Sequence, residues 1–172
     1  MNEEREAAAL VFLERQATKE SFRQREYHAK CWLNKVYEVT QKELAAKEEV
    51  MHRLEGMITN GAIDYAKDRV QSSETAGQEK RTIAFIEAAE AVDKTKEKIA
   101  GLISERMDVI DKMNGSNHRA VLIHRYVNMC KWPEIAEKMS YSVRQAQRIH
   151  DEAIKKITPI VEEYLVSKGD ER

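Results

Sequence analysis

The side chains best suited to chemistry in this sequence are basic and amide groups in the stretch MSYSVRQAQRIHDEAIKKI, residues 139–157. Arg144, Gln145 and Arg148 lie within two helical turns of one another, and no carboxylate occurs in the stretch before Asp151. Arginine can bond the O6 and N7 atoms of guanine together, and glutamine can bond adenine in a similar two-point way. This spacing predicts a surface that reads the edges of DNA bases.

Helical periodicity sorts the same stretch into two faces. At about 100° per residue, the basic and amide residues share one face with Glu152 and Lys155. Ser142, with Gln145 three residues later, forms a capping-box pattern, which predicts that the helix begins at Val143. His150 falls among apolar residues, so it is expected to be a packed, hydrogen-bonded core residue rather than a catalytic or metal-binding one. The face expected to be buried consists of Val143, Ala146, His150, Ala153, Ile154 and Ile157.

Positive charge is concentrated in the same part of the chain. The whole sequence has a net charge of −1, but residues 117–157 carry eight Lys and Arg against four Asp and Glu. A basic surface attracts a polyanion, so double-stranded DNA is the expected partner, and the alternative is a charged helix face that meets only water. Contacts to the DNA backbone, which add affinity without reading sequence, are expected from Lys138, Ser142, Lys155 and Lys156.

Other residue types that could do chemistry lack the partners they would need. Glu49 and His52 form a single E-x-x-H pair, whereas a carboxylate di-metal site needs two such pairs and further carboxylates. His28 and Cys31 are one turn apart without other ligands, and Cys31 and Cys130 form no C-x-x-C motif. Glycine-rich phosphate loops and nucleophile motifs do not occur in the sequence. We therefore expect no catalytic residue, no metal site and no cofactor, and we do not expect an enzyme.

A second candidate surface lies nearer the N-terminus, where basic and aromatic residues alternate. Residues 1–60 carry ten Lys and Arg against eleven Asp and Glu, so the charge of that region is balanced. A solvated helix face is therefore favoured over a second nucleic-acid surface. The residues concerned are Arg23, Arg25, Lys30 and Lys35, with Phe22, Tyr27 and Trp32 between them.

Long helices are expected to precede this basic region, and the fold class is expected to be all-α. From Asn2 to Glu55 there is neither glycine nor proline, which predicts one long helix or two helices separated near residues 18–21. A second long helix is expected over residues 79–113, after a polar linker at 66–80. Apolar residues in both helices recur every three or four positions, which predicts an antiparallel or coiled-coil-like pair, or self-association. In the first helix these are Trp32, Val36, Val39, Val50, Leu54, Met57 and Ile58.

Shorter helices follow, in the order of a helix-turn-helix. Asn117 is expected to cap the first of them, and Pro133 suits the first turn of the second, where Trp132 would pack rather than stack on a base. Ser140 to Ser142 form the turn before the last helix, and Thr158-Pro159 predicts its break or kink. The expected domains are a helical association module (1–113), a DNA-binding domain (117–157) and a short C-terminal helix or tail (158–172).

The run RYVNMCKWPEIAEKMSYSVRQAQRIHDEAIKKI (125–157) carries a recognisable motif, and DRVQSS (68–73) with the spacing of Asp93, Ile99, Leu102 and Ile103 adds to it. The motif resembles the C-terminal helix-turn-helix of phage and prophage regulators of the ArpU and RinA type, which are similar to region four of sigma-70 factors. The similarity spans about residues 28–157, and its C-terminal third is specific. The matching residues are Tyr126, Val127, Trp132, Glu134, Ile135, Ala136, Tyr141, Ser142, Arg144, Gln145, Arg148, Ile149, His150 and Ala153.

The resemblance implies a transcription regulator of phage genes, acting on late operons, whose last helix reads promoter or operator DNA. It also makes host RNA polymerase an implied protein partner. Two residues depart from the pattern. Ser140 stands where glycine is common, so a left-handed conformation there would be strained, and Ala146 replaces a larger apolar residue.

Two other functions agree with the same features. A phage small terminase subunit also combines a helix-turn-helix with oligomerising helices, although its DNA-binding part usually comes first. A purely structural helical adaptor is the third possibility. No apolar run is long enough for a membrane span, and the acidic start MNEEREAAAL does not resemble a secretory signal, so a cytoplasmic location is expected.

Overall fold

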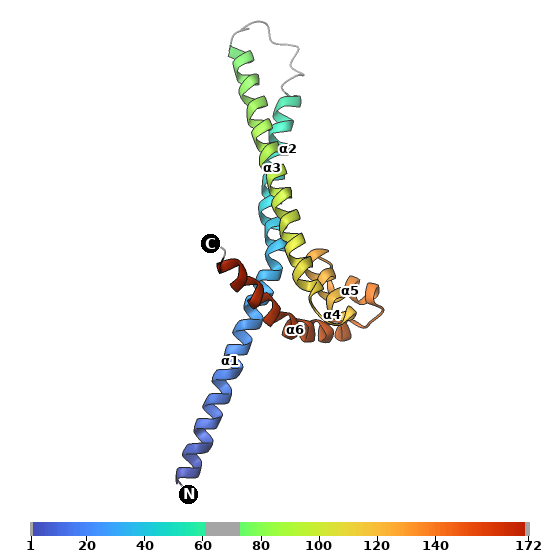
Figure 1. Cartoon of the computed structure of the whole chain (residues 1–172). Coiled ribbons are helices and arrows are strands. Elements are labelled where there is room, and N and C mark those ends of the chain that lie inside the picture. The colour runs from blue at the N-terminus through green and yellow to red at the C-terminus, as the bar shows by residue number, and fades with distance from the viewer. Residues whose placement is uncertain (1, 61–72, 171–172) are drawn as a thin grey trace. The chain divides into compact units, whose positions relative to one another are not determined.

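Helices make up all of the regular structure in the part of the chain that the computed structural model describes, which confirms the all-α fold class (Figure 1). The backbone is described for residues 2–60 and 73–170, and the side chains for residues 18–59 and 77–169. The elements are α1 (Asn2–Glu38), η1 (Val39–Leu44), α2 (Ala45–Asn60), α3 (Ser73–Asp111), α4 (Ser116–Leu122), η2 (Ile123–Val127), α5 (Trp132–Met139) and α6 (Val143–Asp170).

The chain divides into two compact units that do not follow the boundary expected at residues 113–117. Unit 1 consists of residues 1–35 and 105–172, and unit 2 consists of residues 36–104. The turn at 113–117 lies inside unit 1, between α3 and α4. The short helices therefore share a compact unit with parts of both long helices.

Unit 2 contains an antiparallel pair formed by η1 and α2 on one side and α3 on the other (Figure 1). Lys98 Nζ donates to Glu43 Oε2 at 2.8 Å, and Lys47 Nζ donates to Thr95 Oγ1 at 2.7 Å. As residue numbers rise on one helix, those of the partners fall on the other. The expected pairing of the two long helices is antiparallel in this unit.

The first helical region is continuous. No break occurs near residues 18–21, because α1 runs to Glu38 and the π-helical turn η1 joins it to α2. The expected linker at 66–80 is wrong for residues 73–80, which belong to α3, while residues 66–72 lie outside the described part. The run SETAGQEK has one glycine and no proline, and its Glu, Ala, Gln and Lys residues favour a helix.

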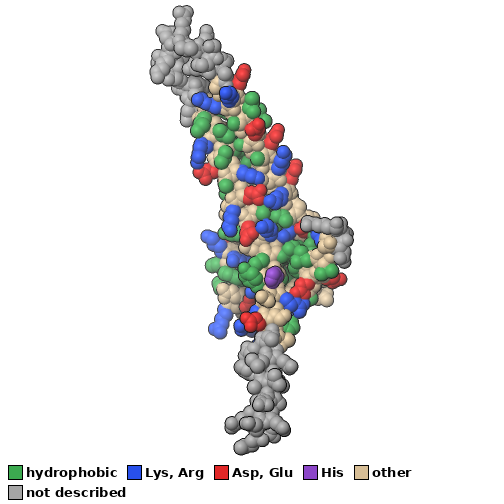
Figure 2. Space-filling view, turned by 90° about the vertical axis from the view of Figure 1, so that its left-hand side faces the viewer, with side chains coloured by type: hydrophobic (Ala, Val, Ile, Leu, Met, Phe, Trp, Pro, Cys, Tyr) green, Lys and Arg blue, Asp and Glu red, His purple; other side chains and the backbone are tan. Residues whose placement is uncertain are grey.

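The apolar seam of unit 2 is only partly covered. Val36, Val39 and Val92 are buried, whereas four other apolar residues remain about half exposed. These four are Val50 at 50%, Met57 at 49%, Ile83 at 55% and Ile86 at 51% exposed. Figure 2 shows hydrophobic patches along this antiparallel pair, with positive and negative side chains among them. Part of the apolar seam is therefore not covered by contacts within unit 2.

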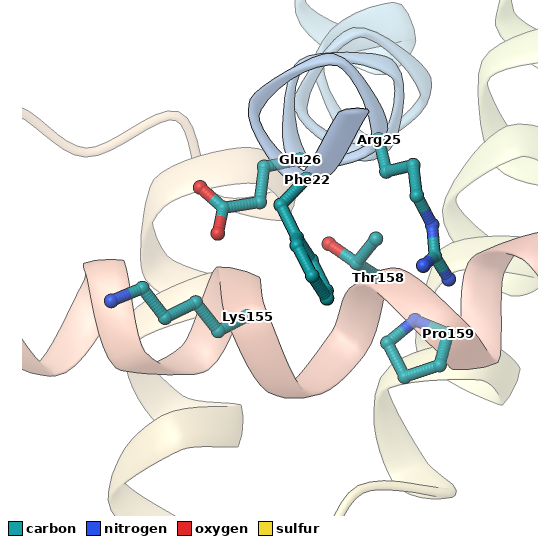
Figure 3. Close-up of a pocket in the computed structure, with 6 residues that line it drawn as sticks. All are labelled: Phe22, Arg25, Glu26, Lys155, Thr158 and Pro159. Carbon is teal, nitrogen blue, oxygen red and sulfur yellow. The ribbon is translucent and has the colours of Figure 1, made fainter. Parts of the chain in front are cut away.

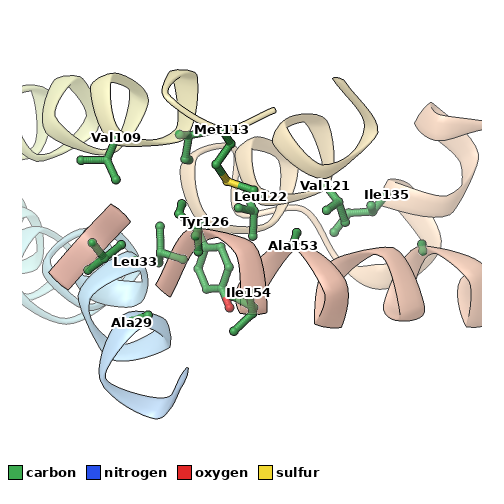
Figure 4. Packing of buried hydrophobic residues seen from close by; sticks show 14 of the residues in the cluster. Ala29, Leu33, Val109, Met113, Val121, Leu122, Tyr126, Ile135, Ala153 and Ile154 are labelled. Atoms are coloured by element: carbon green, nitrogen blue, oxygen red, sulfur yellow. The ribbon is translucent and has the colours of Figure 1, made fainter. Parts of the chain in front are cut away.

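Unit 1 is built around α6, against which α4 and α5 both pack (Figure 4). Ala29 and Leu33 of α1 enter the same core, as do Val109 and Met113 of α3. Burying a leucine, isoleucine or valine side chain contributes about 1.5–3 kcal/mol. The largest fully buried side chains in the core of unit 1 are Leu33, Ile110, Met113, Leu122, Ile135, Ile154, Ile157, Val109, Val121 and Val161.

Two expectations for unit 1 are wrong. Asn117 does not cap α4, which begins at Ser116 after Gly115; its Nδ2 instead donates to Tyr141 Oη at 2.9 Å. The break at Thr158-Pro159 is also wrong, because α6 continues to Asp170, while the alternative of a kink there stays a prediction. Pro159 is exposed and removes one backbone N–H from the helix, while the buried residues on either side of it hold the helix to the core. Thr158 Oγ1 donates to Ile154 O at 2.8 Å in addition.

Candidate nucleic-acid interface

The turn between α5 and α6 is closed by backbone hydrogen bonds. Ser140 N donates to Glu137 O at 3.1 Å, and Tyr141 N donates to Ala136 O at 2.9 Å. Ser140 has φ 56° and ψ 40°, which is the left-handed conformation expected at this position. A serine pays about 1–2 kcal/mol there relative to the usual right-handed region. The turn therefore has a fixed geometry that is held against some strain.

The first turn of α6 has the expected capping box. Gln145 N donates to Ser142 Oγ at 3.2 Å, and Ser142 N donates to Gln145 Oε1 at 3.0 Å. The Ser142 hydroxyl also donates to Gln145 Oε1, at 2.9 Å. The carbonyl oxygen of the Gln145 side chain is thus already engaged. A two-point contact with adenine needs this oxygen together with the amide NH₂, so Gln145 must leave the cap to make one.

The two faces of α6 lie largely as expected. Arg144, Gln145, Arg148, Glu152 and Lys155 are exposed. Ala146, His150, Ala153, Ile154 and Ile157 are all buried. Val143 is the exception, since it is 38% exposed. Helical phase sets the direction of a side chain, but the side chain is buried only if another element covers it. Along α6 the first covered residue is Ala146, about one turn after Val143.

His150 is a packed, hydrogen-bonded core residue, as expected. Its Nε2 lies 3.0 Å from Tyr126 Oη, and the ring of Trp132 meets it edge-on with ring centres 5.2 Å apart. Burial lowers the pKa of His150 and raises the pKa of Tyr126 to about 12. Arg125 lies over the outer part of this cluster, with its guanidinium carbon 5.0 Å from the centre of the Trp132 ring. The cluster supports the base of α6 and keeps its polar face outward.

The predicted backbone-contacting lysines point in three different directions. Lys138 Nζ donates to Cys130 Sγ at 3.3 Å, on the side of η2 and α5. Lys156 Nζ lies 3.4 Å from His118 Nε2, on the side of α4. Lys155 lies beside α1. The structure therefore distributes these charges around α6 instead of gathering them.

Helix α1 flanks the C-terminal half of the outer face of α6 (Figure 3). Phe22 points toward α6 between Lys155 and Thr158, and together with Pro159 these residues line an opening of about 490 Å³. Arg25 forms a two-point ion pair with Glu162, with Nε 2.6 Å from Oε1. The guanidinium lowers the pKa of the Glu162 carboxyl. Arg25 is thus engaged within the chain, as befits a structural rather than a nucleic-acid-binding residue.

The turn before α4 lies beside a basic residue of α6, which no pattern in the sequence predicted. Lys112 and Asn114 line one opening together with Lys156, although more than 40 positions separate them from it in the chain. The only signal in the sequence was the turn pattern MNGSN beside a lysine. Among the described residues, no three His, Cys, Asp or Glu side chains come together as a metal site would require, and no helix is long and apolar enough to cross a membrane.

Comparison with known proteins gave no match to a family model, a curated protein or a solved structure. The resemblance to phage regulators of the ArpU and RinA type therefore depends on the motif residues of the chain itself.

Proposed function

We propose that this chain is a sequence-specific transcription regulator that binds double-stranded DNA with the first two turns of α6. The observation that carries the proposal is the pair of exposed guanidinium groups, Arg144 and Arg148, at the start of a capped helix that follows a tight turn. The N-terminal residues of a recognition helix are those that reach base edges in the major groove. Arginine is the side chain that most often reads guanine there.

The surroundings of α6 support this use of its first turns. The buried face from Ala146 onward fixes the helix on the core, so the opposite face is presented rigidly. Beyond Glu152, helix α1 lies beside the outer face through Phe22 and Arg25. A duplex approaching α6 would therefore meet its N-terminal half first, which is where the arginines are.

Charge also favours this surface. Neither Arg144 nor Arg148 forms an ion pair among the residues with described side chains. Elsewhere in unit 1, Arg25 and Arg106 are both paired with glutamates. Guanidinium groups without a carboxylate partner do not have to break an existing pair to bind DNA. We expect affinity to fall steeply with salt, as it does when phosphates are neutralised.

The narrower part of the proposal concerns the genes regulated. The motif at residues 125–157 is the one that resembles regulators of the ArpU and RinA type, so we propose phage or prophage genes, specifically late operons, as the targets. A sigma-region-four-like helix-turn-helix, host RNA polymerase as a second partner and a cytoplasmic location belong to the same proposal. Gln145 is included as a base-reading residue once it leaves its cap.

The first test is a selection of bound fragments from prophage-containing genomic DNA, using the full chain at two salt concentrations. We expect a short recurring sequence upstream of an operon, with weaker recovery at the higher salt concentration. Fragments without any shared sequence would contradict sequence-specific regulation.

The second test removes the proposed reading groups. Arg144→Ala/Arg148→Ala should cost about 1–3 kcal/mol per arginine and relax base preference. The matched control, Arg53→Ala/Arg81→Ala in unit 2, removes the same charge from exposed helix positions and should bind like the parent. Circular dichroism shows whether each variant is folded. If a folded Arg144→Ala/Arg148→Ala protein bound the selected DNA as tightly as the parent, this face would not be the reading surface.

A phage small terminase subunit is the second candidate, and the half-exposed apolar residues of unit 2 favour it. Val50, Met57, Ile83 and Ile86 suit contact with another copy of the chain, which ring assembly requires. Light scattering separates the two functions: a ring of many subunits supports the terminase, and a monomer or dimer supports the regulator. Failure to bind any DNA in a salt-sensitive way would instead support a structural adaptor.

A further inference from the structure

A second basic site lies on unit 1, at the turn that joins α3 to α4. Lys112, Met113, Asn114, Lys156 and Ile160 line an opening of about 310 Å³. Its apolar floor includes Met113, which is 2% exposed, whereas Lys112, Asn114 and Lys156 at its rim are exposed. The site thus combines two ammonium groups and one amide around a small hollow that is open to solvent.

The turn that carries the site is held in place. Arg119 Nη1 donates to Met113 O at 2.8 Å, and Met113 N donates to Ile110 O at 3.0 Å. Gly115 has φ 104°, and a Cβ there would lie 2.7 Å from His118 Nδ1, so only glycine fits between the turn and this ring. Lys112 and Asn114 are therefore presented by a defined backbone.

Neither lysine of the hollow is neutralised by an ion pair within the described side chains. Among the residues with described side chains, neither Lys112 nor Lys156 takes part in an ion pair. On the α6 side, the Glu152 carboxylate lies 3.5 Å from His118 Nε2. The ammonium of Lys156 lies 3.4 Å from the same ring nitrogen, so one carboxylate is close to this lysine without forming an ion pair with it. Asp111 is the neighbouring acid on α3 and is exposed.

The position of the site relative to the reading face indicates its ligand. Lys156 follows Arg148 by eight residues, which is about 12 Å along a helix. A recognition helix lies in the major groove, and phosphates border that groove on both sides. Lys156 faces α4 while Arg148 faces outward, so a duplex read by Arg148 would bring one of its strands toward this flank. Backbone phosphates are the anions that such a flank would meet.

We propose that Lys112, Asn114 and Lys156 form a binding site for a DNA backbone phosphate on the α4 side of α6. This inference rests on the proposed function, because it requires DNA to be bound by α6. The two ammonium groups would attract the phosphate, and the Asn114 amide would donate a hydrogen bond to one of its oxygens. Such contacts position the protein on the duplex and carry no sequence information.

The test measures the affinity of the full chain for a selected DNA fragment over a series of salt concentrations. Lys112→Gln/Lys156→Gln should reduce the slope of log K against log salt by about 0.9, because the two lysines share one phosphate and each lost phosphate contact contributes about 0.9. Between 50 and 200 mM salt, the parent should therefore lose about 3.5-fold more affinity than this variant. The ranking of different DNA sequences should stay the same.

Two control proteins make the result specific. Lys94→Gln/Lys96→Gln removes two exposed lysines from unit 2 and should keep the slope of the parent. Lys112→Arg/Lys156→Arg keeps both charges and should also keep it. If Lys112→Gln/Lys156→Gln showed the same slope of log K against log salt as the parent, the phosphate site would be wrong, but the proposed reading face of α6 would not be affected. If the parent itself showed no salt-dependent binding to any fragment, the proposed function and this site would both be wrong.

Discussion

The hydrogen bond between Tyr126 and His150 offers a direct test of how the base of α6 is supported. Asp151 Oδ1 lies 3.4 Å from Nδ1 of the His150 ring, and a carboxylate can only accept, so Nδ1 carries the proton. Nε2 is then the acceptor, and the Tyr126 hydroxyl donates to it at 3.0 Å. Tyr126→Phe removes this donor while keeping the ring that fills the core.

The expected cost follows from burial. Tyr126 and His150 are each only 7% exposed, so water cannot easily replace the lost hydroxyl. An unsatisfied buried acceptor costs about 1–3 kcal/mol, and for a unit of roughly 100 residues about 2 kcal/mol lowers the melting temperature by roughly 10 °C. Tyr141→Phe is the matched control, because the hydrogen bond of Tyr141 with Asn117 is exposed and water can substitute for it.

Tryptophan fluorescence is a suitable measurement, because both tryptophans of the chain, Trp32 and Trp132, lie in unit 1. Urea unfolding followed by this signal gives the free energy of unfolding of each variant. If Tyr126→Phe lost no more stability than Tyr141→Phe, the hydrogen bond would not be what holds His150 in place, and the argument from burial would be refuted.

The same histidine gives a dependence on pH whose sign is fixed by its burial. Burial lowers the pKa of His150 in the folded protein, whereas an unfolded chain titrates near about 6.5. Between these values the unfolded state binds a proton that the folded state does not, so stability falls as the pH drops below about 6.5. His150→Gln should flatten this part of the profile, and an unchanged slope would contradict the assignment.

Three further predictions concern local geometry in unit 1. Ser142→Ala should lower the free energy of unfolding by about 1 kcal/mol through loss of the helix cap, whereas Ser142→Thr should retain most of it; equal losses in urea unfolding would exclude a capping role. Ser140→Gly should raise the free energy of unfolding by about 0.5 kcal/mol and so raise the melting temperature slightly, because glycine relieves the left-handed strain at a smaller entropic cost. A lower melting temperature would show that Ser140 is not strained. Leu122→Ala should cost about 2–5 kcal/mol because its side chain is fully buried, whereas Leu165→Ala, at a residue 45% exposed, should cost much less. Similar losses for the two variants in calorimetry would contradict this difference.

Local patterns in the sequence predicted the start and most of the buried face of the last helix. The start at Val143, the pairing of Ser142 with Gln145 and the burial of His150 all follow from residues within a few positions of one another. Such features depend on helical phase and hydrogen-bonding groups, both of which can be read along the chain. Of the residues that helical phase placed on the buried face, only Val143 is exposed, because no other element covers it.

Features that depend on distant elements could not be predicted. Ala29 and Leu33 pack into the core of unit 1, but their spacing on α1 would equally suit a partner helix in another chain. The break expected at Pro159 did not occur, because packing of the flanking helix outweighed the loss of one backbone hydrogen bond. Lys112 and Lys156 meet only because α3 and α6 come together at the turn before α4.

The cap at Ser142 has a consequence for the pattern of bases that this helix would select. Under the proposed function, the arginines at positions 144 and 148 need give up no protein ion pair before they bind DNA, whereas Gln145 must first give up its capping bonds. That loss, about 1 kcal/mol, offsets much of the 1–3 kcal/mol that a good two-point contact adds in discrimination. In an alignment of selected sites, the base pair opposite Gln145 should therefore be the more variable one, and the two arginine-contacted pairs should be nearly invariant.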